Sequence, residues 1–211
     1  MDGLTTSEST VRFARLSRTR RVETVSDDED AQLMLAYARG EMRAFETLYS
    51  RHRGALYRYL TRQARDGEVA NDLFQEVWSR VIVNRARYEP RAKFRTFLFT
   101  LAHNCFIDHC RRTKARPGGF SVEDADDADM LPAADDMQPD AMLSREENSR
   151  RYRAALATLP AEQRDVYLLH EESDLSLEDI ARITGVGAET AKSRLRYAVA
   201  KLKAALTVAE A

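Results

Sequence analysis

The sequence predicts an all-α protein in which two small helical domains are joined by a flexible acidic linker. Apolar residues recur at helical spacing in two separate stretches, residues 26–116 and 144–211. Only 8 glycines and 5 prolines interrupt the 211 residues, which favours long helices. Between the two stretches, residues 117–143 carry three prolines, two adjacent glycines and many acids without apolar periodicity, so we expect this segment to be disordered.

The first domain, residues 26–116, is expected to hold four helices. Ser26 lies three residues before Glu29, a capping pattern that predicts a helix start, and Gly40 closes this short helix. Longer helices are predicted over residues 42–64, 68–84 and 94–114. The residues expected to face inward from these three are Phe45, Leu48, Tyr49, His52, Leu56, Tyr57, Leu60, Val69, Leu73, Val77, Val81, Phe94, Phe97, Leu98, Leu101 and Cys105.

The second domain, residues 144–211, begins with a second capping pattern at Ser144. One helix stops at Pro160, and the next carries the apolar residues Val166, Tyr167 and Leu169. A third capping pattern at Ser176 then opens two short helices around a glycine turn.

These last two helices have the pattern of a helix-turn-helix. Ile180, Ala181 and Ile183 are predicted to face the core, and Gly185 supplies the positive φ that ends the first helix. The second helix is predicted over residues 190–203, with Ala191, Leu195, Ala198 and Leu202 inward. Its polar residues then remain available for a DNA groove and its phosphates, whereas a plain helical hairpin would leave them only solvated.

Charge is segregated along the chain, although the formal net charge is −1. Residues 91–116 carry seven Lys or Arg against one Asp, and residues 188–203 carry five against Glu189. Residues 123–147 carry ten acids against Arg145. Such blocks are often only solvated surface, so a binding function needs accompanying features.

The basic helix of residues 91–116 has such features. Four phenylalanines alternate with Arg and Lys, and Asn104, Asp108 and Arg111 project from one side. Aromatic rings and guanidinium groups stack on unstacked bases, while basic side chains follow phosphates. Most of the phenylalanines are expected in the core, so the polar row and the basic end of the helix carry the functional signal.

Several classes of function are disfavoured. No run of about 18 apolar residues occurs and residues 1–25 lack an apolar block, so we expect a cytoplasmic protein without membrane insertion. No phosphate-binding glycine loop, HExxH motif or nucleophile elbow is present, so neither an enzyme nor a cofactor is expected. Cys105 and Cys110 lie about 140° apart around a helix and are expected as reduced thiols. Together with His103 and His109 they point in several directions, so no metal site is expected.

The motifs, taken in order, resemble one family. These are DLFQEVW at residues 72–78, NCFIDHCRR at 104–112, LPAEQRDVYLLH at 159–170 and LSLEDIARITGVGAETAKSRL at 175–195. In this order they resemble the extracytoplasmic-function (ECF) group of bacterial sigma factors, over about residues 44–206. The resemblance implies a promoter-specific transcription initiation factor, often part of a stress response, with sigma region 2 in residues 26–116 and region 4 in residues 144–211.

The resemblance also implies partners and site residues. The partners are core RNA polymerase, through its clamp coiled coil and flap, promoter DNA and an anti-sigma factor. The residues implied in core polymerase binding are Asp72, Leu73, Gln75, Glu76 and Trp78. Those implied in melting and reading the −10 element are Arg91, Lys93, Arg95, Asn104, Asp108, Arg111 and Arg112, with Asn104 near a flipped base. Those implied in reading the −35 element are Thr190, Lys192, Ser193, Arg194, Arg196 and Tyr197.

Some features depart from the family pattern or lie outside it. Thr184, Gly187 and Ala191 replace the larger apolar residue, the proline and the valine that are frequent there, which leaves the −35 sequence open. Residues 1–25, with five arginines, match nothing in the pattern and are expected to form a disordered basic extension. The acidic linker is expected to thread through the polymerase as an RNA mimic, or else to serve only as a soluble tether. Two other functions stay open: an autonomous helix-turn-helix regulator and a helical protein-interaction adaptor.

Overall fold

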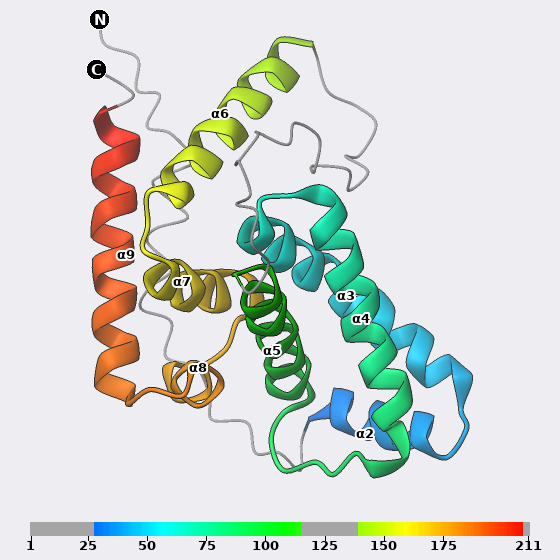
Figure 1. The fold of residues 1–211 in the computed structure, drawn as a ribbon. Coiled ribbons are helices and arrows are strands. Elements are labelled where there is room, and N and C mark those ends of the chain that lie inside the picture. Colours follow the sequence, from blue (N-terminus) through cyan, green and yellow to red (C-terminus); the bar gives the residue numbers. More distant parts are fainter. Residues whose placement is uncertain (1–27, 115–138, 209–211) are drawn as a thin grey trace, which may run out of the picture.

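The computed structural model describes residues 28–114 and 139–208, and every regular element in these two ranges is helical (Figure 1). The elements, in chain order, are α2 (Glu29–Ala38), α3 (Met42–Ala64), α4 (Gly67–Asn84), the short 3-10 helix η3 (Arg85–Arg87), α5 (Phe94–Lys114), α6 (Pro139–Ala157), α7 (Ala161–Ser173), α8 (Leu177–Thr184) and α9 (Ala188–Val208). The all-α prediction is therefore confirmed.

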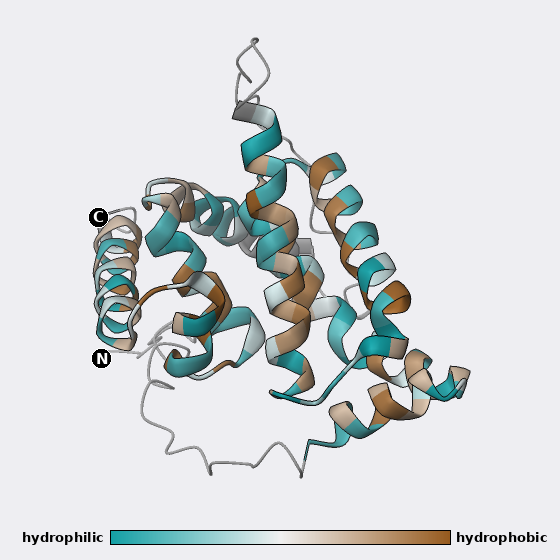
Figure 2. Cartoon of the chain, turned by 60° about the horizontal axis from the view of Figure 1, so that its bottom comes forward, coloured by the Kyte–Doolittle hydropathy of each residue, from teal (hydrophilic) through white to brown (hydrophobic). Residues whose placement is uncertain are grey.

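Helix α3 is the centre of the first bundle, because α2, α4 and α5 all pack against it. Leu48, Leu56 and Leu60 of α3 are completely buried, as the apolar spacing predicted. Most helices in Figure 2 carry hydrophobic residues on one sector and hydrophilic residues on another, which is the pattern of helices that cover a core.

One carboxylate ties the start of α2 to the start of α5. The Asp28 side chain accepts a hydrogen bond from the backbone amide of Asp30 at 3.3 Å and another from that of Phe94 at 2.6 Å. Asp28, not the predicted Ser26, is therefore the N-cap of α2, and Ser26 lies outside the described residues. Because Phe94 is the first residue of α5, the basic helix is oriented from its first turn by the N-terminal end of the domain.

Two other helix ends follow their sequence patterns. Ser176 Oγ accepts a hydrogen bond from the Asp179 amide at 3.1 Å and so caps α8 as predicted. Gly185 has a φ of +67°, in the left-handed region, and ends α8 as predicted for the turn of the helix-turn-helix.

The first helix of the second half begins within the last residues of the predicted linker. Helix α6 begins at Pro139, whereas the linker was expected to reach Leu143 and the helix to start at Ser144. Proline at the first helical position lacks only an amide that would be unsatisfied there anyway, and its fixed φ suits the helix. The rest of the predicted linker and the basic N-terminal extension lie outside the described residues.

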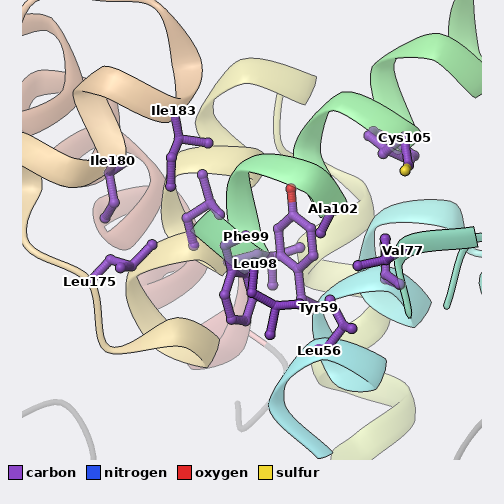
Figure 3. Packing of buried hydrophobic residues seen from close by; sticks show 14 of the residues in the cluster. Leu56, Tyr59, Val77, Leu98, Phe99, Ala102, Cys105, Leu175, Ile180 and Ile183 are labelled. Carbon is purple, nitrogen blue, oxygen red and sulfur yellow. The ribbon is translucent and has the colours of Figure 1, made fainter. Parts of the chain in front are cut away.

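The two helical halves of the chain pack against each other, which the sequence did not predict. Helix α3 contacts α7, and α5 contacts α7 and α8. Figure 3 shows Leu175, Ile180 and Ile183 of the second half beside Leu98 and Phe99 of the first. One apolar core therefore runs through both halves.

Within the described ranges, no helix combines the length and the apolar character that a membrane span requires.

Candidate nucleic-acid and partner interfaces

Helix α4 presents only part of its predicted polymerase-binding set to solvent. Asp72 and Gln75 are exposed, and Glu76 is half-buried. Leu73 and Trp78 are 2% and 5% exposed, so both belong to the core. The set is thus divided into a surface row and two buried residues beneath it.

Trp78 is held in an aromatic cluster under this surface row. Its ring lies 5.7 Å from that of Phe45 in an edge-to-face arrangement, 5.0 Å from Tyr49 and 6.4 Å from Phe74. Aromatic pairs at these distances stabilise beyond their burial of area. In this conformation Trp78 fixes the position of α4 against α3 and has little surface with which to contact a partner.

A network of charges joins α4 to α5. Glu76 lies 2.6 Å from Arg80 of its own helix and 3.7 Å from Arg112 of α5. Arg80 also lies 3.8 Å from Asp108, which in turn lies 3.7 Å from Arg111. Burial opposes the charge of Arg80, but its hydrogen bond to Glu76 and the nearby carboxylate of Asp108 outweigh this, so its pKa is raised. The prediction from sequence missed Arg80, although its i,i+4 spacing from Glu76 was a signal.

The predicted −10 residues of α5 do not all share a face. Asn104, Asp108, Arg111 and Arg112 recur at i, i+4, i+7 and i+8 and so form one row, in which Asn104 is exposed. Arg95 precedes Asn104 by nine residues, which places it about 180° away around the helix. It lies 3.7 Å from Asp174 in the second half of the chain. The structure thus brings four of these residues together and separates Arg95 from them.

The row continues into an open depression at the N-terminal end of α5. The depression has a volume of about 420 Å³ and is lined by Asn84, Arg87, Tyr88, Glu89, Arg91, Phe97 and Leu101. Phe97 and Leu101 lie on the Asn104 face, seven and three residues before it. The Tyr88 hydroxyl is buried and has no hydrogen-bond partner within the described part of the chain. An aromatic, cationic and amide-lined depression of this kind can hold a planar base.

The two remaining predicted −10 residues precede α5. Arg91 lines the depression, is exposed and pairs with Glu89 at 2.6 Å. Lys93 is half-buried and lies one residue before the helix. Asn84, Arg87 and Tyr88 were missed by the prediction because they lie at the last residue of α4, in η3 and directly after it, where the apolar periodicity of the long helices ends.

The predicted −35 residues of α9 form two rows. Thr190, Ser193, Arg194 and Tyr197 recur at i, i+3, i+4 and i+7 and share one face. Lys192 and Arg196 form a second row on another face, and both are exposed. Ala191, Leu195, Ala198 and Leu202 are buried as predicted, so the helix turns both rows away from the core.

Arg194 is the most constrained of these six side chains. Its Nη2 lies 2.6 Å from Glu162 at the start of α7, and the arginine side chain is 24% exposed. The Arg196 guanidinium instead lies 5.1 Å above the Tyr197 ring, a cation–π contact that joins the two rows. Lys192 makes only a solvent-exposed pair with Glu189 at 3.6 Å.

The histidines and cysteines of α5 do not converge on a common metal site. Among the described residues, no group of three or more potential metal ligands comes together. Burial raises the pKa of Cys105 to about 11, with Arg80 lowering it by less, so its thiol is protonated at neutral pH. No disulfide joins Cys105 and Cys110.

Comparisons with known proteins identify the fold family. The sigma-70 region 2 model matches residues 48–116, and the sigma-70 region 4 model matches residues 149–202. The RNA polymerase sigma factor CarQ of Myxococcus xanthus is 32% identical over 78% of this chain and 90% of its own length. The ECF RNA polymerase sigma factor SigM of Mycobacterium tuberculosis is 30% identical over 82% of this chain and 82% of its own.

Solved structures show the same fold. CnrH in complex with the cytosolic domain of CnrY superimposes with a TM-score of 0.63 at 23% identity, over 86% of this chain and 99% of that one. The sigma factor RpoE of Bartonella quintana, in complex with the anti-sigma factor NepR, gives a TM-score of 0.62 at 24% identity, over 78% of this chain and 97% of that one.

The chain belongs to the ECF group of the sigma-70 family of sigma factors. It acts with core RNA polymerase and promoter DNA and directs promoter-specific initiation of transcription.

Proposed function

We propose that three separate surfaces divide the work of initiation. Helix α4 docks core polymerase, α5 and its depression open and read the −10 element, and α9 reads the −35 element. The observation that carries the proposal is the single row of Asn104, Asp108, Arg111 and Arg112, which leads directly into the depression beside Tyr88.

The surface row of α4 is the proposed docking site for the clamp coiled coil. Asp72, Gln75 and Glu76 supply polar and acidic groups that a basic or polar partner surface can match. Leu73 and Trp78 act beneath them by holding α4 in place, which revises their direct role implied by the resemblance. Region 4 would contact the flap.

The α5 row would guide a single strand whose base leaves the duplex. Arg111 and Arg112 would bind phosphates, and Asn104 would hydrogen-bond a base edge. The depression would receive the unstacked base beside Phe97 and Tyr88, whose rings already contact each other edge to face with centroids 5.2 Å apart. No motif for nucleotide hydrolysis accompanies this row, so the opening would use binding energy, and the protein is proposed not to be an enzyme.

The two rows of α9 would take different parts of the −35 duplex. The face with Ser193 and Arg194 enters the major groove, and Lys192 and Arg196 on the second row bind phosphates. In the free protein, the ion pair with Glu162 would hold the Arg194 side chain in a defined position. On binding DNA, Arg194 would leave Glu162 and contact a guanine instead.

The domain roles and the regulation follow the family. Residues 26–116 and 144–211 would act as regions 2 and 4, in the cytoplasm. Two solved structures of this fold contain a bound anti-sigma factor or the cytosolic domain of a partner, which supports a comparable regulator for this chain.

Binding to promoter DNA with and without core polymerase tests the function. We expect the purified protein to retard promoter DNA only with core, and potassium permanganate to detect unpaired thymines at −10 only in that complex. Binding of a palindromic duplex by the protein alone would favour an autonomous regulator instead.

A further inference from the structure

Helix α2 supports the depression at the N-terminal end of α5 from two sides. It packs against η3 and α5, two of the elements that line the depression, and lies at the bottom of Figure 1 beside the segment that joins α4 to α5. At the C-terminal end of α2, the Tyr37 ring lies 5.7 Å from the guanidinium carbon of Arg85 in η3. At the N-terminal end, Asp28 accepts a hydrogen bond of 2.6 Å from the Phe94 amide. Tyr37 and Asp28 themselves lie outside the lining of the depression.

Phe94 connects this support to the wall of the depression. Its ring is completely buried and lies 5.3 Å from that of His52, 6.4 Å from that of Tyr88 and 6.1 Å from that of Phe97. Tyr88 and Phe97 are the aromatic members of the lining. The Asp28 carboxylate fixes the backbone of Phe94, and close packing fixes its ring. Because a packed interior transmits small displacements, a shift of Phe94 would move both lining rings.

A second carboxylate anchors the same end of α2. Asp30 Oδ2 lies 2.7 Å from Nε2 of the buried His52, and Asp30 Oδ1 accepts a hydrogen bond from Arg51 at 2.7 Å. Burial raises the pKa of Tyr88, and the charges of Asp28 and Asp30 raise it further, so both carboxylates lie close enough to act on the phenol. The start of α2 is therefore fixed to α3 in the immediate surroundings of Tyr88.

We propose that Asp28 is a positioning residue for −10 recognition, which sets the shape of the base-holding depression through Phe94. The proposal rests on the function proposed above. Asp28 does not touch DNA and acts only through the rings of Tyr88 and Phe97. A site that receives a planar base needs walls held to within a fraction of an ångström, and hydrogen bonds behind those walls supply this constraint.

The two carboxylate oxygens of Asp28 have different partners, so its two roles can be separated. Oδ1 accepts a hydrogen bond from the Asp30 amide at 3.3 Å and caps α2, whereas Oδ2 accepts the one from the Phe94 amide. Asparagine caps helices about as well as aspartate, but it has a single acceptor oxygen beside an amino group. Asp28→Asn should therefore keep the cap and leave the Phe94 amide without its acceptor, whereas Asp28→Ala removes both hydrogen bonds.

Promoter opening by the holoenzyme, reconstituted from core polymerase and the full chain, tests this role. The template is a duplex promoter that the parent holoenzyme selects from a randomised library, together with variants that carry single −10 base-pair changes. Permanganate reactivity at saturating core measures the opening rate, and titration of labelled core measures docking. For Asp28→Asn we expect unchanged core affinity and slower opening of the selected promoter. Its preference for that promoter over one of the single −10 variants should be several-fold smaller than the parental preference.

Asp66→Ala is the matched control for the loss of a helix cap. The Asp66 carboxylate accepts hydrogen bonds from the amides of Glu68 and Val69, so it caps α4 through that helix's own first turn. Asp66→Ala should lower the free energy of unfolding, as Asp28→Ala does, because both remove a capping side chain. It should nevertheless leave the −10 preference of the bound complex at the parental value. Urea unfolding of each variant measures the stability against which the preferences are compared.

A parental −10 preference in both Asp28→Asn and Asp28→Ala would overturn the positioning role. An equal loss of preference in Asp66→Ala would also overturn it, because the loss would then follow stability and not the link to Phe94. Asn104→Ala in the same assay separates this role from the proposed function. If Asn104→Ala reduces the preference and the Asp28 variants do not, only the positioning role is rejected. If Asn104→Ala keeps the parental preference as well, the proposed function of the α5 row is rejected.

Discussion

Glu76 of α4 and Arg112 of α5 lie 3.7 Å apart, so the helix proposed to dock polymerase and the helix proposed to bind the −10 strand share one carboxylate. Arg80 extends this link, because it contacts both Glu76 and Asp108. A partner that engages Glu76 would release Arg112 toward phosphate. We therefore expect docking and strand binding to be coupled through this side chain.

This coupling predicts different effects for two adjacent substitutions. Gln75→Ala should weaken core binding by about 1–2 kcal/mol, roughly tenfold, and leave −10 opening by the bound complex unchanged. Glu76→Gln should weaken binding similarly and also alter the rate of opening. Titration of labelled core and permanganate kinetics at saturating polymerase would measure the two effects. Identical opening rates for both variants would remove Glu76 from the coupling.

Trp78 is predicted to matter for stability more than for contact. Trp78→Ala should lower the free energy of unfolding by about 3–5 kcal/mol, because it empties the aromatic cluster with Phe45 and Tyr49. Urea denaturation followed by circular dichroism measures this change, with the exposed Gln75→Ala as the control. A Trp78→Ala protein of parental stability that fails to bind core would place the indole in the interface instead.

The two rows of α9 predict distinct roles for Arg194 and Lys192. Arg194→Ala should reduce discrimination at one −35 base pair by about 1–3 kcal/mol, whereas Lys192→Ala should weaken binding to all sequences and reduce the salt dependence by about one phosphate contact. Glu162→Gln should strengthen −35 binding a few-fold, because Arg194 no longer has to leave a carboxylate. Holoenzyme titrations across salt concentrations and base-pair variants measure all three. Equal loss on every −35 sequence for Arg194→Ala would exclude base reading.

The lowered pKa of Asp30 predicts how the stability of the fold changes at acidic pH. Burial alone would raise its pKa, but hydrogen bonds with His52 and Arg51 outweigh this and lower the pKa to about 2. As the pH falls from about 4 toward 2, the unfolded state takes up the proton first, so the stability contributed by Asp30 is present above this range and lost within it. Asp30→Asn should lower the free energy of unfolding at pH 7 by about 2 kcal/mol. It should also reduce the further decrease in that free energy between about pH 4 and pH 2.

Urea unfolding between pH 7 and pH 2.5 measures the contribution of Asp30. Glu29→Gln is the control, since Glu29 is 83% exposed and accepts a long hydrogen bond of 3.4 Å from Arg51. The same acid sensitivity in Asp30→Asn and the parent would contradict the assignment.

How far the sequence predicts the structure depends on whether a feature is local. The spacing of Asn104, Asp108 and Arg111 predicted their common face, because a regular helix fixes it. Arg95 was grouped with them because it lies in the segment that the resemblance implies in −10 reading, and its position around the helix separates it from them. Leu73 was expected both inward and in the partner set, and packing assigns it to the core.

Features that depend on long-range packing were not predictable. The contact of Asp165 with Tyr59 joins residues 106 positions apart, and no periodicity encodes such a pair. The depression beside Tyr88 likewise forms only where the end of α4, η3 and the start of α5 converge.

Selection of promoters from a randomised duplex library tests the division of labour most directly. The library is transcribed with core polymerase and the parent, Asn104→Ala or Arg194→Ala protein, and the selected templates are sequenced. The parent should select two sequence blocks at a fixed spacing only when core is present. Arg194→Ala should relax the upstream block, and Asn104→Ala the downstream block. Selection of a single palindromic block without polymerase, or the same blocks for all three proteins, would contradict the proposed surfaces.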